Sequence, residues 1–132
     1  GDFEAVRAIS EIVTESIVCG LARAGMADID RCGEAIKKAK RGRIHTFLST
    51  SPVHMKWKLQ MEPEQVLEMI VSSVTRARNH VEDVEWSAED GTRTEMDFLC
   101  RCVEAAIEGE SPPAPSDAPS TVAMIATAHC CA

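Results

Sequence analysis

Short strand-like segments alternate with helical segments along the whole first part of the chain. The strand-like segments are 16–22 (SIVCGLA), 43–50 (RIHTFLST) and 81–87 (VEDVEWS), and the helical ones are 3–13, 27–42, 53–60, 62–80 and 94–109. Buried-type strands that alternate with amphipathic helices are typical of a parallel sheet built from βα units. The pattern predicts an α/β fold with about three such units.

Two helix starts carry specific signals. Pro63 stands at a position where a first helical turn tolerates proline. Thr94 with Asp97 fits the S/T-x-x-D/E pattern of a capped helix start. At the other end of a helix, Gly42 is predicted to terminate the segment 27–42.

Polar side chains follow the predicted strands, where chemistry collects in parallel α/β folds. Ser87 and Glu89 alternate, so both can point into one cleft. His45 lies in a strand close to its end, and the residues alone favour neither a structural nor a functional role. Arg23 is likewise either an anion-holding group or a surface charge.

Four further titratable groups are interpreted as structural or solvated. His54 follows Pro52 and is expected at the surface, and His80 ends a helix, where a cation is favourable. Asp83 and Asp90 are expected to be solvated.

Composition excludes several classes of protein. The 132 residues carry a net charge of −7, and the basic cluster 37–43 (KKAKRGR) falls at a predicted helix end, so no nucleic-acid partner is expected. No apolar run approaches the roughly 20 residues of a membrane span, and no secretory signal is visible. The six cysteines form no C-x-x-C pair, which favours reduced thiols in the cytoplasm over a zinc site.

The two ends of the sequence suggest a piece of something longer. The chain starts without Met, inside a predicted helix. Residues 110–132 contain prolines at 112, 113, 115 and 119, which remove the donors that a central strand needs. We therefore expect two regions, a partial catalytic domain over 1–109 and an irregular Pro/Ser/Ala-rich tail over 110–132.

Three motifs in the expected order resemble the 2-isopropylmalate synthase family. They are GDFEAV at the start, RIHTFLSTSPVHMKWKL, and RARNHVEDVEWSAEDGTRTEMDFL. This family belongs to the acyl-CoA-dependent Claisen-condensing enzymes, near homocitrate and citramalate synthases. The resemblance covers residues 1 to about 109 and implies part of a TIM (β/α)8 barrel, with a C-terminal tail that diverges from the family.

The resemblance implies an acyltransferase that condenses acetyl-CoA with 2-oxoisovalerate in leucine biosynthesis. Glu89 matches a catalytic position, and His45 and Ser87 match residues that bind the keto acid. Phe47 and Leu21 match the apolar wall around its branched side chain.

The resemblance also implies parts that this chain lacks. The divalent metal of the intact enzyme (Mn, Mg or Zn) takes its ligands from the Asp of an Arg-Asp pair before Gly1, whose Arg faces the developing oxyanion, and from an H-x-H motif beyond Ala132, so no metal ligand is expected here. The intact enzyme is expected to be a homodimer and the isolated chain inactive. The alternatives are a homocitrate or citramalate synthase fragment, a non-catalytic α/β interaction module, and a cysteine-based metal protein.

Overall fold

The computed structural model describes residues 2–109 and 123–124. Its strands form one parallel sheet in the order β1-β2-β3-β4, which is also their order along the chain. The strands are β1 (Val18–Arg23), β2 (Gly42–Ser49), β3 (Asp83–Glu89) and β4 (Ala123–Met124). The helices are α1 (Asp2–Ile12), α2 (Met26–Ile36), α3 (Pro52–His54), the π-helical turn η1 (Met55–Leu59), α4 (Pro63–Arg78), the 3₁₀ turn η2 (Gly91–Arg93) and α5 (Met96–Glu108). The predicted α/β fold with a parallel sheet is confirmed.

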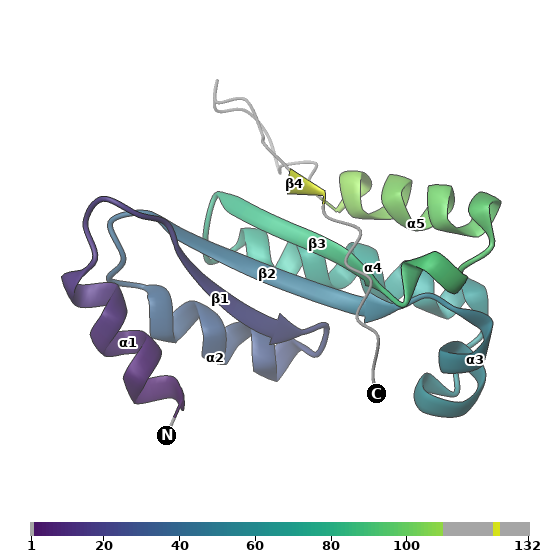
Figure 1. Cartoon of the computed structure of the whole chain (residues 1–132), viewed down its shortest axis with the longest axis horizontal. Helices are drawn as coiled ribbons and strands as arrows, with labels where there is room; N and C mark the ends of the chain where they lie inside the picture. The colour runs from purple at the N-terminus through teal and green to yellow at the C-terminus, as the bar shows by residue number, and fades with distance from the viewer. Residues whose placement is uncertain (1, 110–122, 125–132) are drawn as a thin grey trace.

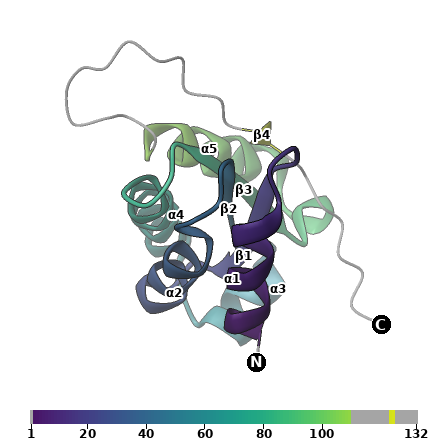
Figure 2. The ribbon, with the colours of Figure 1, turned by 90° about the vertical axis from the view of Figure 1, so that its left-hand side faces the viewer.

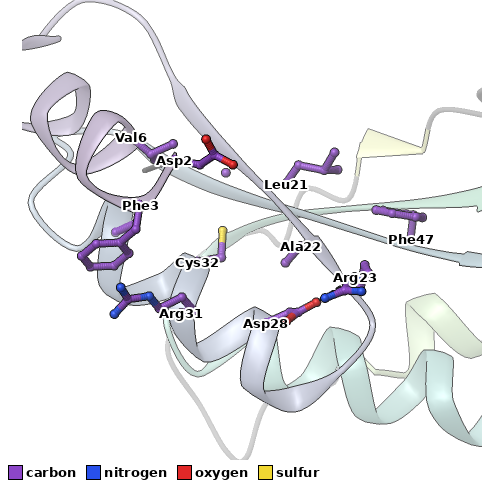
Figure 3. A pocket seen from close by; sticks show the side chains of 12 residues that line it. Asp2, Phe3, Val6, Leu21, Ala22, Arg23, Asp28, Arg31, Cys32 and Phe47 are labelled. Atoms are coloured by element: carbon purple, nitrogen blue, oxygen red, sulfur yellow. Dashed lines mark hydrogen bonds and ion pairs between the residues drawn. The ribbon is translucent and has the colours of Figure 1, made fainter.

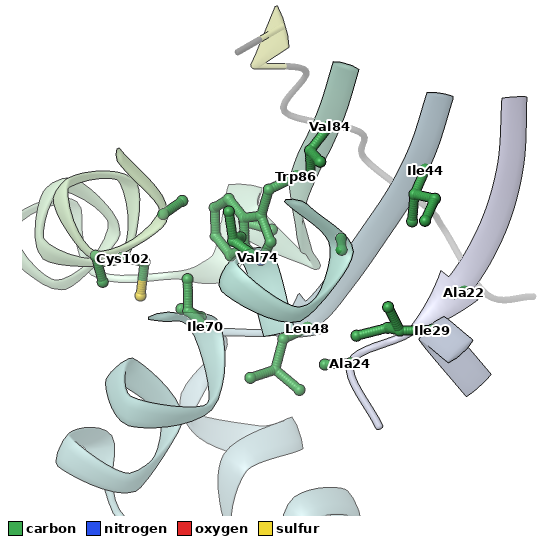
Figure 4. Close-up of a cluster of buried hydrophobic side chains, with 14 of the residues drawn as sticks. Ala22, Ala24, Ile29, Ile44, Leu48, Ile70, Val74, Val84, Trp86 and Cys102 are labelled. Carbon is green, nitrogen blue, oxygen red and sulfur yellow. The ribbon is translucent and has the colours of Figure 1, made fainter. Parts of the chain in front are cut away.

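The long helices cover one side of the sheet. Helices α2, α4 and α5 lie in an arc along the strands, and α1 lies beside α2 near β1 (Figures 1 and 2). Between them and the sheet is a core that includes Ile29, Ile44, Ile70 and Val84, all 0 or 1% exposed (Figure 4). This core fixes which face of each strand is apolar and leaves the opposite face to polar side chains.

Of the two helix starts predicted from the sequence, one is confirmed and one is wrong. Pro63 opens α4 as expected, and Glu62 and Gln65 form a capping box around it. The predicted cap at Thr94 is wrong. Helix α5 begins after Glu95, because the Thr94 hydroxyl is engaged by the Thr50 hydroxyl at 2.7 Å instead.

The end predicted for the second helix is also wrong. Helix α2 stops at Ile36, where the amide of Ala39 turns back to the Ile36 carbonyl at 2.8 Å. The chain then reaches Gly42, which opens β2 and does not close the helix. The basic residues between these points therefore belong to a connection.

The tail is only partly described. Residues 110–122 and 125–132 lie outside the described residues, so their predicted irregularity stays a prediction. Ala123 and Met124 are not irregular, since they pair in parallel with Glu85 and Trp86 of β3. All four tail prolines precede this pair in sequence, so none removes a hydrogen-bond donor from β4. Within residues 2–109 and 123–124, every helix is too short or too polar to cross a membrane.

Gly109, the cap residue of α5, should not tolerate a side chain. A Cβ there would lie 2.8 Å from the Val71 carbonyl oxygen and 3.0 Å from the Val74 Cβ. We expect Gly109→Ala to lower the free energy of unfolding by about 1–3 kcal/mol, since α4 and α5 must separate slightly. Urea denaturation measures this.

Gly25→Ala is the matched control, because a Cβ at Gly25 meets nothing within 4 Å. It should lower stability less than Gly109→Ala does, because alanine is a poorer N-cap for α2 but restricts the unfolded chain. Equal stability of the two variants would contradict the close packing of α5 on α4.

Candidate functional site

The face of the sheet that turns away from the helices carries a row of polar side chains. Alternation along each strand and the register of β1, β2 and β3 place these side chains on one surface, here called the open face. Its residues are Cys19, Leu21 and Arg23 from β1, Arg43, His45, Phe47 and Ser49 from β2, and Asp83, Glu85, Ser87 and Glu89 from β3. All five sequence-predicted site residues lie on this face.

An ion-pair network occupies the end of the open face where the strands begin. Arg43 donates from Nε to Asp83 at 2.9 Å and from Nη1 to Glu85 at 3.1 Å. Asp83 is therefore paired with Arg43, although its side chain keeps 31% of its surface exposed, so the solvated role predicted for it holds only in part. The network joins β2 to β3 at the end of the open face opposite Glu89.

His45 and Ser87 meet in the middle of the open face. The His45 Nε2 lies 2.8 Å from the Ser87 hydroxyl, and its Nδ1 lies 3.5 Å from Glu85. The ring also makes an edge contact with Phe47, with centroids 6.5 Å apart. These contacts fix the orientation of the imidazole and bring three predicted site residues together.

Glu89 lies where β3 ends, in contact with two other elements. Ser49, its register partner on β2, donates a hydrogen bond to it, and Lys58 of η1 donates to its two oxygens at 2.8 and 2.7 Å. Burial acts to raise the pKa of Glu89, but the hydrogen bonds from Lys58 and Ser49 outweigh it and the pKa is lowered. The group is a carboxylate at neutral pH.

Lys58 was not predicted from the sequence. Its segment 53–60 was expected to be helical, but a helical pattern does not reveal which lysine reaches a neighbouring strand. Lys58 is nine positions from Ser49 in the sequence and 31 positions from Glu89.

The residue after Glu89 forms a second polar cluster. Asp90 is only 5% exposed, and its carboxylate accepts a hydrogen bond from Arg93 at 2.7 Å and lies 3.0 Å from the His54 Nδ1. The same nitrogen lies 2.9 Å from the Ser51 hydroxyl. The surface role predicted for His54 and the solvated role predicted for Asp90 are both wrong, because the turns after β2 and β3 bring them together.

Leu21 and Phe47 line a cavity of about 340 Å³ beside β1 (Figure 3). Leu21 is 66% exposed, and β1 pairs only with β2 among the described strands. Arg23 is also exposed and forms an ion pair with Asp28 at 2.5 Å, so its side chain is held against α2. The apolar part of the candidate site is therefore at the open edge of the sheet.

No group of three or more His, Cys, Asp or Glu side chains among residues 2–109 and 123–124 is arranged to hold a metal ion. Cys102 is buried and Cys100 is exposed, so they point in different directions. Cys130 and Cys131 lie outside the described residues. The part of the chain that is described thus does not fit a complete metal centre.

Comparisons with known proteins match this chain to one family. The model of the HMGL-like family matches residues 1–130, across the predicted boundary at residue 109. Over 108 residues the chain is 75% identical to 2-isopropylmalate synthases of Bradyrhizobium sp. (strain BTAi1 / ATCC BAA-1182) and Caulobacter vibrioides (strain NA1000 / CB15N). It is 73% identical to that of Rhodopseudomonas palustris (strain TIE-1).

In each case the aligned residues cover 82% of this chain and 21% of the relative, so the chain spans about one fifth of the length of the curated relatives it matches. These matches confirm the resemblance that the sequence motifs indicated. They also confirm the parallel sheet as part of a (β/α)8 barrel.

The Asp90 cluster gives a pH prediction. Arg93 first, then Ser51 and His54, lowers the pKa of Asp90 to about 2 from an ordinary value of 3.8. Because the folded-state pKa lies below the unfolded one, the carboxylate stabilises the fold above about pH 4, and this contribution is lost as the pH falls to about 2. We expect Asp90→Asn to lower the urea midpoint at pH 7, and the difference from the parent chain to shrink towards pH 2.

Glu68→Gln serves as control, since it removes one carboxylate from the exposed surface of α4. It should change the midpoint little at any pH. An Asp90→Asn variant as stable as the parent at pH 7 would show that the cluster does not stabilise the fold.

Proposed function

Since the chain belongs to the HMGL-like family, we propose that it is a segment of a 2-isopropylmalate synthase. The intact enzyme would condense acetyl-CoA with 2-oxoisovalerate to give 2-isopropylmalate and CoA, a step of leucine biosynthesis. The observation that carries this proposal is the 75% identity over 108 residues to relatives of that name. The open face supports it, because it gathers the candidate residues on one surface.

The geometry of the open face suits a keto acid with an apolar branch. His45 and Ser87, 2.8 Å apart, offer hydrogen-bonding atoms for the oxygens of the keto acid. Leu21 and Phe47 offer apolar surface on the same face, at the border of the cavity beside β1, whose other walls come from α1 and α2. A branched aliphatic side chain gains free energy from leaving water at such a surface.

Glu89 is the group we propose for proton transfer. It is ionised at neutral pH, the form that a general base requires, although its lowered pKa makes it a weaker base than a free glutamate. As base it would accept a proton from the acetyl methyl group of acetyl-CoA. The resulting enolate carbon would bond to the keto carbon while the π electron pair of the keto group moves to its oxygen, which takes up a proton. Water would then hydrolyse the thioester to a carboxylate and the free thiol of CoA.

A divalent metal in the intact enzyme would act as a Lewis acid on the keto oxygen. Its ligands are proposed to lie in parts of the enzyme outside this chain, since the described residues hold no complete ligand set. A homodimer in the cytoplasm is proposed for the intact enzyme.

Homocitrate and citramalate synthases are the second candidates, because their reactions differ only in the keto acid. The apolar pair Leu21 and Phe47 favours 2-oxoisovalerate over 2-oxoglutarate, which carries a second carboxylate. A non-catalytic module is a further alternative that the same experiment addresses.

A chimeric enzyme tests the proposal. The 108 aligned residues of this chain would replace the matching segment of the Bradyrhizobium relative, which the 75% identity makes structurally compatible. We expect the chimera to release CoA from acetyl-CoA in the presence of 2-oxoisovalerate, and less with pyruvate or 2-oxoglutarate. A folded but inactive chimera would refute the assignment.

His45→Ala and Glu89→Gln in the chimera should each lower kcat/KM at least about tenfold, a loss of about 1.4 kcal/mol of transition-state stabilisation. Glu68→Gln, on the exposed surface of α4, should leave it unchanged. We expect no CoA release from the isolated 132-residue chain with Mg²⁺, Mn²⁺ or Zn²⁺ added. Turnover by that chain would contradict the proposal that the metal ligands of the active site lie outside it.

A further inference from the structure

The segment that follows β2 reaches across to the end of β3. Residues 52–60, here called the arm, comprise α3 and η1 and end at Gln60, which has a positive φ of 56°. Met55 is buried and anchors the arm, whereas Trp57 is 72% exposed. A π-helical turn is rare and often marks a functional site, because it displaces side chains from ordinary helical positions.

Two side chains of the arm hold consecutive residues of β3 and its following turn. Lys58 contacts both oxygens of Glu89, and His54 contacts Asp90. Asp90 has a positive φ of 61°, which is uncommon for a residue other than glycine and costs free energy. The arm thus holds Glu89 beside a residue whose backbone conformation needs outside support.

We propose that Lys58 is a positioning residue, which fixes both oxygens of the Glu89 carboxylate through hydrogen bonds of 2.8 and 2.7 Å. The catalytic meaning of this role rests on the proposed function, but the contact itself does not. Nothing in the sequence motifs assigns a role to Lys58.

The surroundings of Glu89 leave Lys58 as the principal cation acting on it. From β2 the contact is the Ser49 hydroxyl, which is neutral, and from the arm His54 adds a weaker charge effect when protonated. Asp90, the next residue, faces His54 and Arg93. A cation within hydrogen-bonding distance favours the ionised carboxylate, whereas burial opposes it.

Titration of the Glu89 carboxyl by NMR in the 132-residue chain tests this role. In Lys58→Met the titration midpoint of Glu89 should move to higher pH, because burial remains after the cation is removed. Lys58→Arg should keep the midpoint low, since a guanidinium also binds a carboxylate through two hydrogen bonds. An unchanged midpoint in Lys58→Met would overturn the proposal.

Lys56→Met is the matched control. It removes the same charge from the same arm, but Lys56 lies over the Trp57 ring at 5.0 Å. Its Glu89 midpoint should equal that of the parent chain. An equal shift in both variants would attribute the effect to general charge and refute a specific role for Lys58.

The chimera separates this inference from the proposed function. If Glu89 is the base, Lys58→Met should move the acidic limb of the pH profile of kcat/KM to higher pH, and Lys58→Arg should restore it. A Glu89 midpoint that shifts while the acidic limb stays fixed would support the role of Lys58 and refute the assignment of Glu89 as base.

Discussion

The parallel pairing of β2 with β3 in a single register is the constraint on which the candidate site depends. It places Arg43 opposite Asp83, Phe47 opposite Ser87, and Ser49 opposite Glu89. Because side chains alternate along a strand, a shift of one strand by one residue would turn all of that strand's groups into the helix-facing core. Burial of Ile44 and Val84 against the helices makes such a shift unfavourable, so the apolar core also fixes the polar face.

Much of this arrangement follows from local sequence patterns. Strand-like and helical segments, the start of α4 at Pro63, and the shared face of Ser87 and Glu89 need only periodicity and the preferences of single residues. The contacts of His54, Asp90 and Thr94 need the turns after two different strands to meet, and the residues involved are tens of positions apart. No local sequence pattern encodes contacts between these two turns. For this reason the sequence predicted a surface role for His54, a solvated role for Asp90 and a capping role for Thr94.

The polar half of the candidate site has its contacts within the described residues, whereas the apolar half lies at an edge of the sheet that is unpaired among the described strands. The polar half is held by contacts between β2, β3 and the arm, so its side chains have defined partners within the described residues. The apolar half, with Leu21 and the cavity, lies beside β1, whose outer edge has no partner among the described strands. An unpaired strand edge is a place where further chain can add by backbone hydrogen bonds.

The strand order of the sheet also bears on how the protein is made. Each of the first three strands pairs with the strand that precedes or follows it in the chain, so the contacts that build the sheet join neighbouring βα units. Contacts that are near in sequence close small loops and form quickly. On the ribosome, a newly emerged strand would therefore find its partner already synthesised, and Ser49 and Glu89 would meet as soon as β3 joins β2.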